Sequence, residues 1–195
     1  MGQQDFCVRF YAGYGAYHNE KVNKVLHIVF IPVILFTLLG FIEYARLPDC
    51  RLTLHGPWGL SLNYLYFLHL HLLVSWRSDV PAAAVESVVY VVMMLVSDRL
   101  YGLLQPGLYW KVLLPFHLLG WTAQFIGHFV FEGRRPALFD NLLQIFSAPF
   151  FVVLELMFAC GYKPKLRQEC DVQIKANIAE LEALEAKAKS RGKKG

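Results

Sequence analysis

Charged residues are scarce in this chain of 195 residues: Asp, Glu, Lys and Arg make up 17% of it, and hydrophobic residues make up 56%. A soluble domain usually carries about 25% charged residues. The deficit is concentrated in residues 25–162, which hold seven basic and eight acidic side chains. So little charge excludes an ordinary soluble enzyme and favours a membrane protein with several embedded segments.

The signatures of several common protein classes are also missing. The four cysteines form neither a C-x-x-C pair nor a zinc-finger spacing, so we expect unpaired structural thiols. The chain has no phosphate-binding loop, Rossmann fingerprint or G-x-S-x-G motif. The repeated H-x-x-x-H and H-x-x-H-H boxes of membrane desaturases are absent, and segment 1–24 lacks the apolar run of a cleavable signal peptide. The net charge of +4 resides in the tail, which gives no indication of nucleic-acid binding.

Five apolar stretches are long enough to be embedded in a bilayer: 25–42, 58–76, 80–97, 112–131 and 141–162. Basic residues before the first stretch and after the last place both ends in the cytoplasm by the positive-inside rule. This placement requires an even number of crossings. We therefore predict an all-α, polytopic transmembrane bundle of four to five membrane-embedded helices. The third stretch, which is short and interrupted by Glu86, is the one expected not to cross.

The tail, residues 163–195, has a different character from the bundle of residues 1–162. Apolar side chains recur there at helical spacing among Glu, Lys and Ala, namely at Ile174, Ile178, Leu181 and Leu184. We predict a basic, cytoplasmic amphipathic helix that lies on the membrane or pairs with a partner, such as a second copy of the chain. Because the tail contains no histidine, we expect it to be dispensable for chemistry.

Five of the seven histidines fall inside apolar stretches: His27, His69, His71, His117 and His128. An ionisable group at membrane depth is costly, so it normally faces the bundle interior and has a partner or a function. His69 and His71 diverge by 200° on a helix, which favours structural roles for both. His55 lies in a Pro/Gly loop, where we expect it to be solvated.

One helix face in the fourth stretch is polar: at 100° per residue it carries His117, Trp121, Gln124, His128 and Glu132. His128 and Glu132 are four residues apart, so both can reach one ion. His117 and His128 are about 16 Å apart along a straight helix axis. Two metal ions, or one ion with a second histidine that binds substrate, both fit this spacing.

The N-terminal segment supplies further candidates. His18 and His27 are half a turn out of phase on one helix, so they can face one site only if the helix begins after His18. The Gly13–Gly15 pair allows such a break. Imidazole suits Zn, Fe and Mn, and histidines with a carboxylate and open positions are typical of non-haem Fe(II) oxygenases.

Two long, ordered motifs carry a family resemblance. The first is Tyr14-x2-Tyr17-His18-x4-Asn23-x3-His27-x4-Pro32. The second is Trp121-x2-Gln124-Phe125-x2-His128-x3-Glu132-Gly133-Arg134-Arg135-Pro136-Ala137-Leu138, followed by Asn141-Leu142-x-Gln144, Pro149 and Glu155. Over roughly residues 10–162, the chain resembles the 2-hydroxy fatty acid dioxygenases of the endoplasmic reticulum.

The resemblance implies a multi-pass endoplasmic reticulum protein that uses Fe(II) and O2 to shorten a 2-hydroxy long-chain fatty acid by one carbon. This α-oxidation belongs to phytosphingosine breakdown. The motif histidines His18, His27 and His128 become the expected iron ligands, with His117 as a fourth candidate.

The resemblance also suggests further roles around the iron. His117 and Glu132 are the candidate catalytic residues, and Glu132 could alternatively ligate the metal or orient His128. The expected substrate contacts are Arg134, Arg135, Gln124 and Tyr17. The two arginines could hold a carboxylate through their planar forks, or they could simply set the membrane topology.

Two other functions fit the same residues. A haem protein could use two histidines from different spans as axial ligands, and it would show a Soret absorbance. A non-catalytic membrane scaffold or lipid-binding protein would use the polar stripe only for interhelical hydrogen bonds. It would bind no metal and would tolerate His→Ala changes.

Overall fold

The computed structural model describes residues 2–44, 51–53, 59–61, 69, 74–136 and 143–192. The described chain is almost entirely helical, as expected. Its helices are α1 (Gln3–Gly15), α2 (Lys21–Ile42), α4 (Val80–Leu104), α5 (Pro106–Ile126), the π-helix η1 (Gly127–Glu132), α6 (Leu143–Ala159) and α7 (Pro164–Gly192). One short antiparallel hairpin joins β1 (Arg51–Thr53) to β2 (Gly59–Ser61), with Leu52 opposite Leu60.

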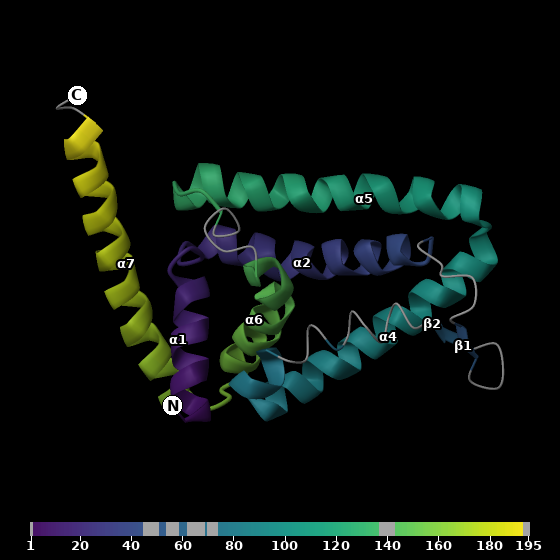
Figure 1. Cartoon of the computed structure of the whole chain (residues 1–195), viewed down its shortest axis with the longest axis horizontal. Helices are drawn as coiled ribbons and strands as arrows, with labels where there is room; N and C mark the ends of the chain where they lie inside the picture. The colour runs from purple at the N-terminus through teal and green to yellow at the C-terminus, as the bar shows by residue number, and fades with distance from the viewer. Residues whose placement is uncertain are drawn as a thin grey trace.

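The helices form two groups. In Figure 1, α5 lies alongside α2, and α4 contacts α2 from its other side. Helices α1, α6 and α7 gather near the end where α2 begins and α5 leads into η1, and in this view they run across the direction of α2 and α5. The first turn of α2 and η1 therefore meet beside the second group, and the candidate site lies at this junction.

Glycines allow α5 and η1 to approach α2 closely. A Cβ atom on Gly120 would lie 2.6 Å from Cγ1 of Ile34, and one on Gly127 would lie 2.3 Å from Oδ1 of Asn23. Small residues at such contacts let two backbones come together, as is common between membrane helices. Gly127 directly precedes His128, so this close contact fixes the start of η1 against the first turn of α2.

Turn chemistry explains where the other helices begin. The Asp79 side chain accepts a hydrogen bond from the backbone N of Ala82 and caps α4. Gln105 has a φ of 60°, which ends helix α4 before Pro106 begins α5. Lys163, with a φ of 40°, likewise precedes Pro164, which begins α7.

The predicted tail helix is part of the core. Leu166, Cys170 and Ile174 of α7 are buried against Cys7 and Tyr11 of α1, in a cluster that α6 completes. The partner of the first half of this amphipathic helix is thus α1 of the same chain. The part of α7 from Leu166 to Ile174 is thus packed against the helical bundle.

Two of the described helices, α2 and α4, are long and apolar enough to cross a membrane. The third apolar stretch belongs to α4, which continues through Asp98 and Arg99 and reaches 25 residues, so its short length is no longer a reason against crossing. Ser147–Ala159 of α6 is also apolar but is shorter than these two helices. Most of the stretch 58–76, together with His55 and His71, lies outside the described residues, and His69 is exposed.

Candidate metal centre

Three buried histidines converge at the junction between the two helix groups. His18 comes from the turn between α1 and α2, His27 from α2 and His128 from η1. One ring nitrogen of each lies within 4.8 Å of those of the other two. Each histidine is at most 5% exposed. The structure thus brings together the three histidines that the two sequence motifs contain.

The chain turn before α2 allows this convergence. Helix α1 ends at Gly15, and α2 starts at Lys21 with Glu20 as its cap, whose side chain accepts a hydrogen bond from the backbone N of Asn23 at 2.9 Å. His18 therefore lies outside α2 and can face His27. The helix break that the Gly13–Gly15 pair allows is therefore present, between α1 and α2.

The hydrogen bonds of His18 and His27 fix their tautomers. Nδ1 of His18 lies 2.8 Å from the carbonyl oxygen of Tyr14, and Nδ1 of His27 lies 2.8 Å from that of Asn23. Since a carbonyl oxygen only accepts, both Nδ1 atoms carry the proton. Burial lowers the pKa of His18 well below its ordinary value, so this ring is neutral.

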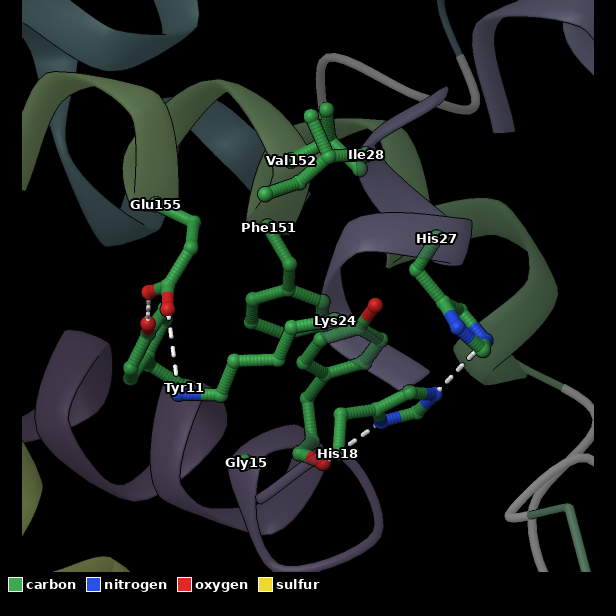
Figure 2. A pocket seen from close by; sticks show the side chains of 10 residues that line it. Tyr11, Gly15, His18, Lys24, His27, Ile28, Phe151, Val152 and Glu155 are labelled. Carbon is green, nitrogen blue, oxygen red and sulfur yellow. Dashed lines mark hydrogen bonds and ion pairs between the residues drawn. The ribbon is translucent and has the colours of Figure 1, made fainter. Parts of the chain in front are cut away.

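As a result, two nitrogen lone pairs face each other. Nε2 of His18 lies 3.0 Å from Nε2 of His27 (Figure 2), and neither atom has a proton to donate when both rings are neutral. A cation between them would satisfy both atoms. With metal–nitrogen bonds of about 2.1 Å, two ligands at a right angle stand about 3.0 Å apart, so the pair fits adjacent positions on a metal ion.

His128 supports the same interpretation. Its Nδ1 is buried and has no hydrogen-bond partner among the described residues. Buried polar atoms normally have partners, so this unpartnered nitrogen leaves His128 with a ring nitrogen available for a ligand. Three neutral imidazoles fit a transition metal with coordination positions left open for other ligands.

Aromatic rings hold His18 in place. The ring of Tyr14 stacks on His18 with centroids 3.7 Å apart and an interplanar angle of 10°. Phe151 of α6 stacks on the Tyr14 ring at 4.3 Å. This stack ties the metal centre to the packing of α1 against α6 and excludes water from one side of His18.

Glu132 connects the three histidine-bearing segments. Its Oε1 accepts from the backbone N of Asn19 at 3.1 Å, and its Oε2 accepts from the backbone N of Glu20 at 2.9 Å and from Nδ2 of Asn23 at 3.0 Å. Asn19 follows His18, and the Asn23 carbonyl orients His27. Glu132 itself lies one turn after His128, and its carboxylate bonds to the α1–α2 turn and to Asn23 of α2.

The second motif does not continue as a regular α-helix. From Gly127 to Glu132 the backbone is π-helical, and Gly133, with a φ of 69°, ends it. Short π-helical segments often occur at functional sites. This widened turn changes the directions of His128 and Glu132 relative to the uniform stripe that 100° per residue predicts.

The structure does not bring His117 into the histidine cluster. Nε1–H of Trp121 donates to Nε2 of His117 at 3.0 Å, so Nδ1 of the neutral ring carries the proton and donates to Oγ1 of Thr37 at 2.8 Å. The Thr37 hydroxyl in turn donates to the carbonyl of Val33. Both ring nitrogens of His117 are therefore used: Nε2 within α5, and Nδ1 in the contact between α5 and α2.

Three of the four predicted substrate contacts bond to chain segments next to the histidines. Nε2 of Gln124 donates to the carbonyl of Leu26 at 3.4 Å, and the carbonyl of Tyr17 accepts from Asn23. Arg134 donates to the carbonyl of Ala16 and pairs with Glu182 of α7, and Arg135 is exposed.

A small cavity of about 20 Å³ adjoins His18 and His27 (Figure 2). Tyr14, Ile28, Phe151 and Val152 form much of its wall, and an ion pair between Lys24 and Glu155 closes its far end. None of the four predicted substrate contacts lines it. Sequence reasoning missed Lys24, although the lone carboxylate in the fifth apolar stretch, Glu155, indicated a buried partner.

Comparison with known proteins agrees with the motifs. Residues 5–160 match the family described as 2-hydroxy-palmitic acid dioxygenase Mpo1-like. The 2-hydroxy-palmitic acid dioxygenase MPO1 of Saccharomyces cerevisiae is 31% identical over 181 residues, which cover 90% of this chain and 95% of the yeast protein. No solved structure gives a significant match. The family resemblance read from the motifs is confirmed, and the chain belongs to the Mpo1-like family.

Proposed function

We propose that this protein is an Fe(II)-dependent dioxygenase that shortens 2-hydroxy long-chain fatty acids by one carbon. The convergence of three buried histidines, two of which direct lone pairs at each other, is the observation that carries the proposal. The name of the yeast relative supports the reaction class and the 2-hydroxy acid.

Iron is favoured over zinc by the kind of chemistry involved. Three histidines with open positions also suit Zn²⁺, but Zn²⁺ has no redox chemistry, whereas a dioxygenase must activate O2. Bound Fe(II) would supply that redox chemistry. The chain itself would hold the metal through His18, His27 and His128 and keep water away through Tyr14 and Phe151.

A haem held by His18 and His27 as its axial pair is a poorer fit. Axial ligands lie on opposite faces of the iron, about 4 Å apart for bonds of about 2 Å. Nε2 of His18 and Nε2 of His27 are 3.0 Å apart, which matches adjacent rather than opposite positions. The geometry therefore supports a non-haem ion.

We further propose that the protein is embedded in the endoplasmic reticulum membrane. Large apolar side chains are exposed on α4 and α5, among them Val88, Val92, Phe116 and Leu118. Exposed apolar surface of this extent fits contact with lipid. The histidines lie where α2 begins and α5 ends, so a fatty acid can keep its chain in the bilayer while its polar end reaches the metal. Each buried CH2 group stabilises such binding by about 0.8 kcal/mol.

Metal analysis of the detergent-purified protein, combined with oxygen uptake, tests the proposal. We expect bound iron in the wild type and strong loss of iron in His18→Ala, His27→Ala and His128→Ala, with His55→Ala as the control that retains it. 2-Hydroxypalmitate should be consumed with O2 and palmitate should not, because only the former can chelate the metal through its hydroxyl and a carboxylate oxygen together. Equal iron content in all variants, equal oxygen uptake with both acids, or full activity in the presence of an iron chelator would contradict it.

A further inference from the structure

The side chain of Lys24 lines the cavity beside the candidate metal centre, and its position suggests a role in substrate recognition. Lys24 lies three residues before His27 on α2, so the two side chains project from the same face of the helix. Figure 2 shows Lys24 between the histidine pair and Glu155. Both Lys24 and the two histidines line the cavity, which has room for about one water-sized group.

Glu155 has two cationic partners, Lys24 and Arg167, and its hydrogen bonds show which of them can leave it to bind substrate. Oε1 of Glu155 lies 3.1 Å from Nζ of Lys24. Oε2 accepts from the Tyr11 hydroxyl and, at 2.6 Å, from NH1 of Arg167. Glu155 therefore keeps two hydrogen bonds if Lys24 turns away, and Arg167 is also held by Asp171 at 2.9 Å.

We propose that Lys24 binds the carboxylate of the substrate. When no substrate is present, Lys24 forms its ion pair with Glu155 instead. The proposal rests on the proposed function, in which a 2-hydroxy acid reaches the metal between His18 and His27. One carboxylate oxygen and the hydroxyl would face the metal, and the other carboxylate oxygen would face Lys24.

This assignment differs from the sequence expectation, which gave the carboxylate to Arg134 and Arg135. Arg134 is already bound to the Ala16 carbonyl and to Glu182, and it does not line the cavity. Lys24 is a positive charge on the wall of the cavity itself, and its partner Glu155 is a carboxylate, the same chemical group that the substrate would present.

Equilibrium binding of 2-hydroxypalmitate and of its neutral amide to the metal-loaded protein tests the proposal. Lys24→Met should weaken binding of the acid roughly 10- to 100-fold, the effect of one charge-assisted hydrogen bond, and should change amide binding little. Lys24→Arg should retain most of the affinity. Lys21→Met, an exposed lysine one turn earlier on α2, is the matched control. Bound metal, measured in every variant, should stay at the wild-type level.

Glu155→Gln gives a prediction of opposite sign. It removes the competing carboxylate but leaves an oxygen for Tyr11 and Arg167, so acid binding should become several-fold tighter. Wild-type affinity in Lys24→Met, or Glu155→Gln weakening acid binding as much as Lys24→Met does, would show that the ion pair is only structural and overturn the subsite. Failure of the proposed function looks different: the wild type would then neither bind nor oxidise 2-hydroxy acids better than palmitate.

Discussion

A single carboxylate, that of Glu132, organises the candidate metal centre without belonging to the histidine cluster. Its two oxygens accept three hydrogen bonds from the turn that carries His18 and from Asn23, whose carbonyl orients His27. Hydrogen bonds from N–H groups to a carboxylate are stronger than neutral ones, each contributing about 1.5–3 kcal/mol. We therefore interpret Glu132 as a positioning residue that joins η1 to the α1–α2 turn.

Replacement of Glu132 should consequently affect the metal more than the fold. We expect Glu132→Ala to weaken iron binding about 10- to 100-fold, the usual range for groups that orient metal ligands. Glu132→Gln should be milder, since its oxygen can still accept one of the three bonds. Titration with Co(II), followed through its visible absorption, measures affinity without requiring turnover. Unchanged Co(II) affinity in Glu132→Ala would contradict this role.

His117 should behave in the opposite way. Its ring links Trp121 to Thr37, so His117→Leu leaves the indole N–H without its acceptor and should lower the free energy of unfolding by about 1–3 kcal/mol. Iron content should stay at the wild-type level. Thermal unfolding in detergent and metal analysis of the same preparation separate the two effects. Loss of iron in a variant with an unchanged unfolding temperature would instead make His117 a ligand.

These residues also show what the sequence could predict about the site. The two family motifs selected His18, His27 and His128, and the Gly13–Gly15 pair predicted the helix break that lets His18 face His27. The roles of His117 and Glu132 could not be read in this way. They depend on which neighbour supplies each donor, and the π-helical turn at Gly127 alters the directions that regular helical spacing predicts.

At the scale of helices, the contact between α1 and α7 is the main feature that periodicity left open. The pattern Ile174, Ile178, Leu181 and Leu184 predicts an apolar stripe, but an amphipathic stripe does not reveal its partner. The structure shows Ile174 against Gly15, where an added Cβ would lie 2.5 Å from its Cδ1 atom. Since α1 leads directly to His18, we no longer expect the tail to be dispensable.

Cysteine reactivity can test this packing. Cys7 of α1 and Cys170 of α7 are buried, and burial raises the pKa of each thiol to about 12. At pH 7–8 both thiols are therefore protonated as well as shielded, and the thiolate is the reactive form. We expect a maleimide to label exposed Cys160 rapidly and Cys7 and Cys170 slowly, as measured by peptide mass spectrometry.

Ile174→Asp supplies the counterpart to this measurement. A carboxylate placed against Gly15 should separate the two helices and make Cys7 and Cys170 reactive. Lys175→Asp, at an exposed position next to it, should leave them protected. Rapid labelling of all three cysteines in the wild type would mean that α7 does not pack on α1.

The same contact constrains the whole molecule in the membrane. Helix α1 precedes the first membrane candidate, α2, and α7 follows every apolar stretch of the chain. Two helices that pack directly on each other outside the bilayer must lie on the same side of it. We therefore expect an even number of crossings between them, as the distribution of basic residues also predicts.

We accordingly expect both termini to face the cytoplasm. Epitope tags at the N- and C-termini should both be digested when protease is added to intact microsomes, whereas a lumenal marker protein stays protected. The excess of Lys and Arg after residue 162 predicts this orientation, and the buried α1–α7 core leads us to expect the N-terminal segment on the same side. Protection of one tag alone would require an odd number of crossings and would be incompatible with this core. Protection of both tags would preserve the packing but reverse the orientation, so the basic tail would then not determine topology.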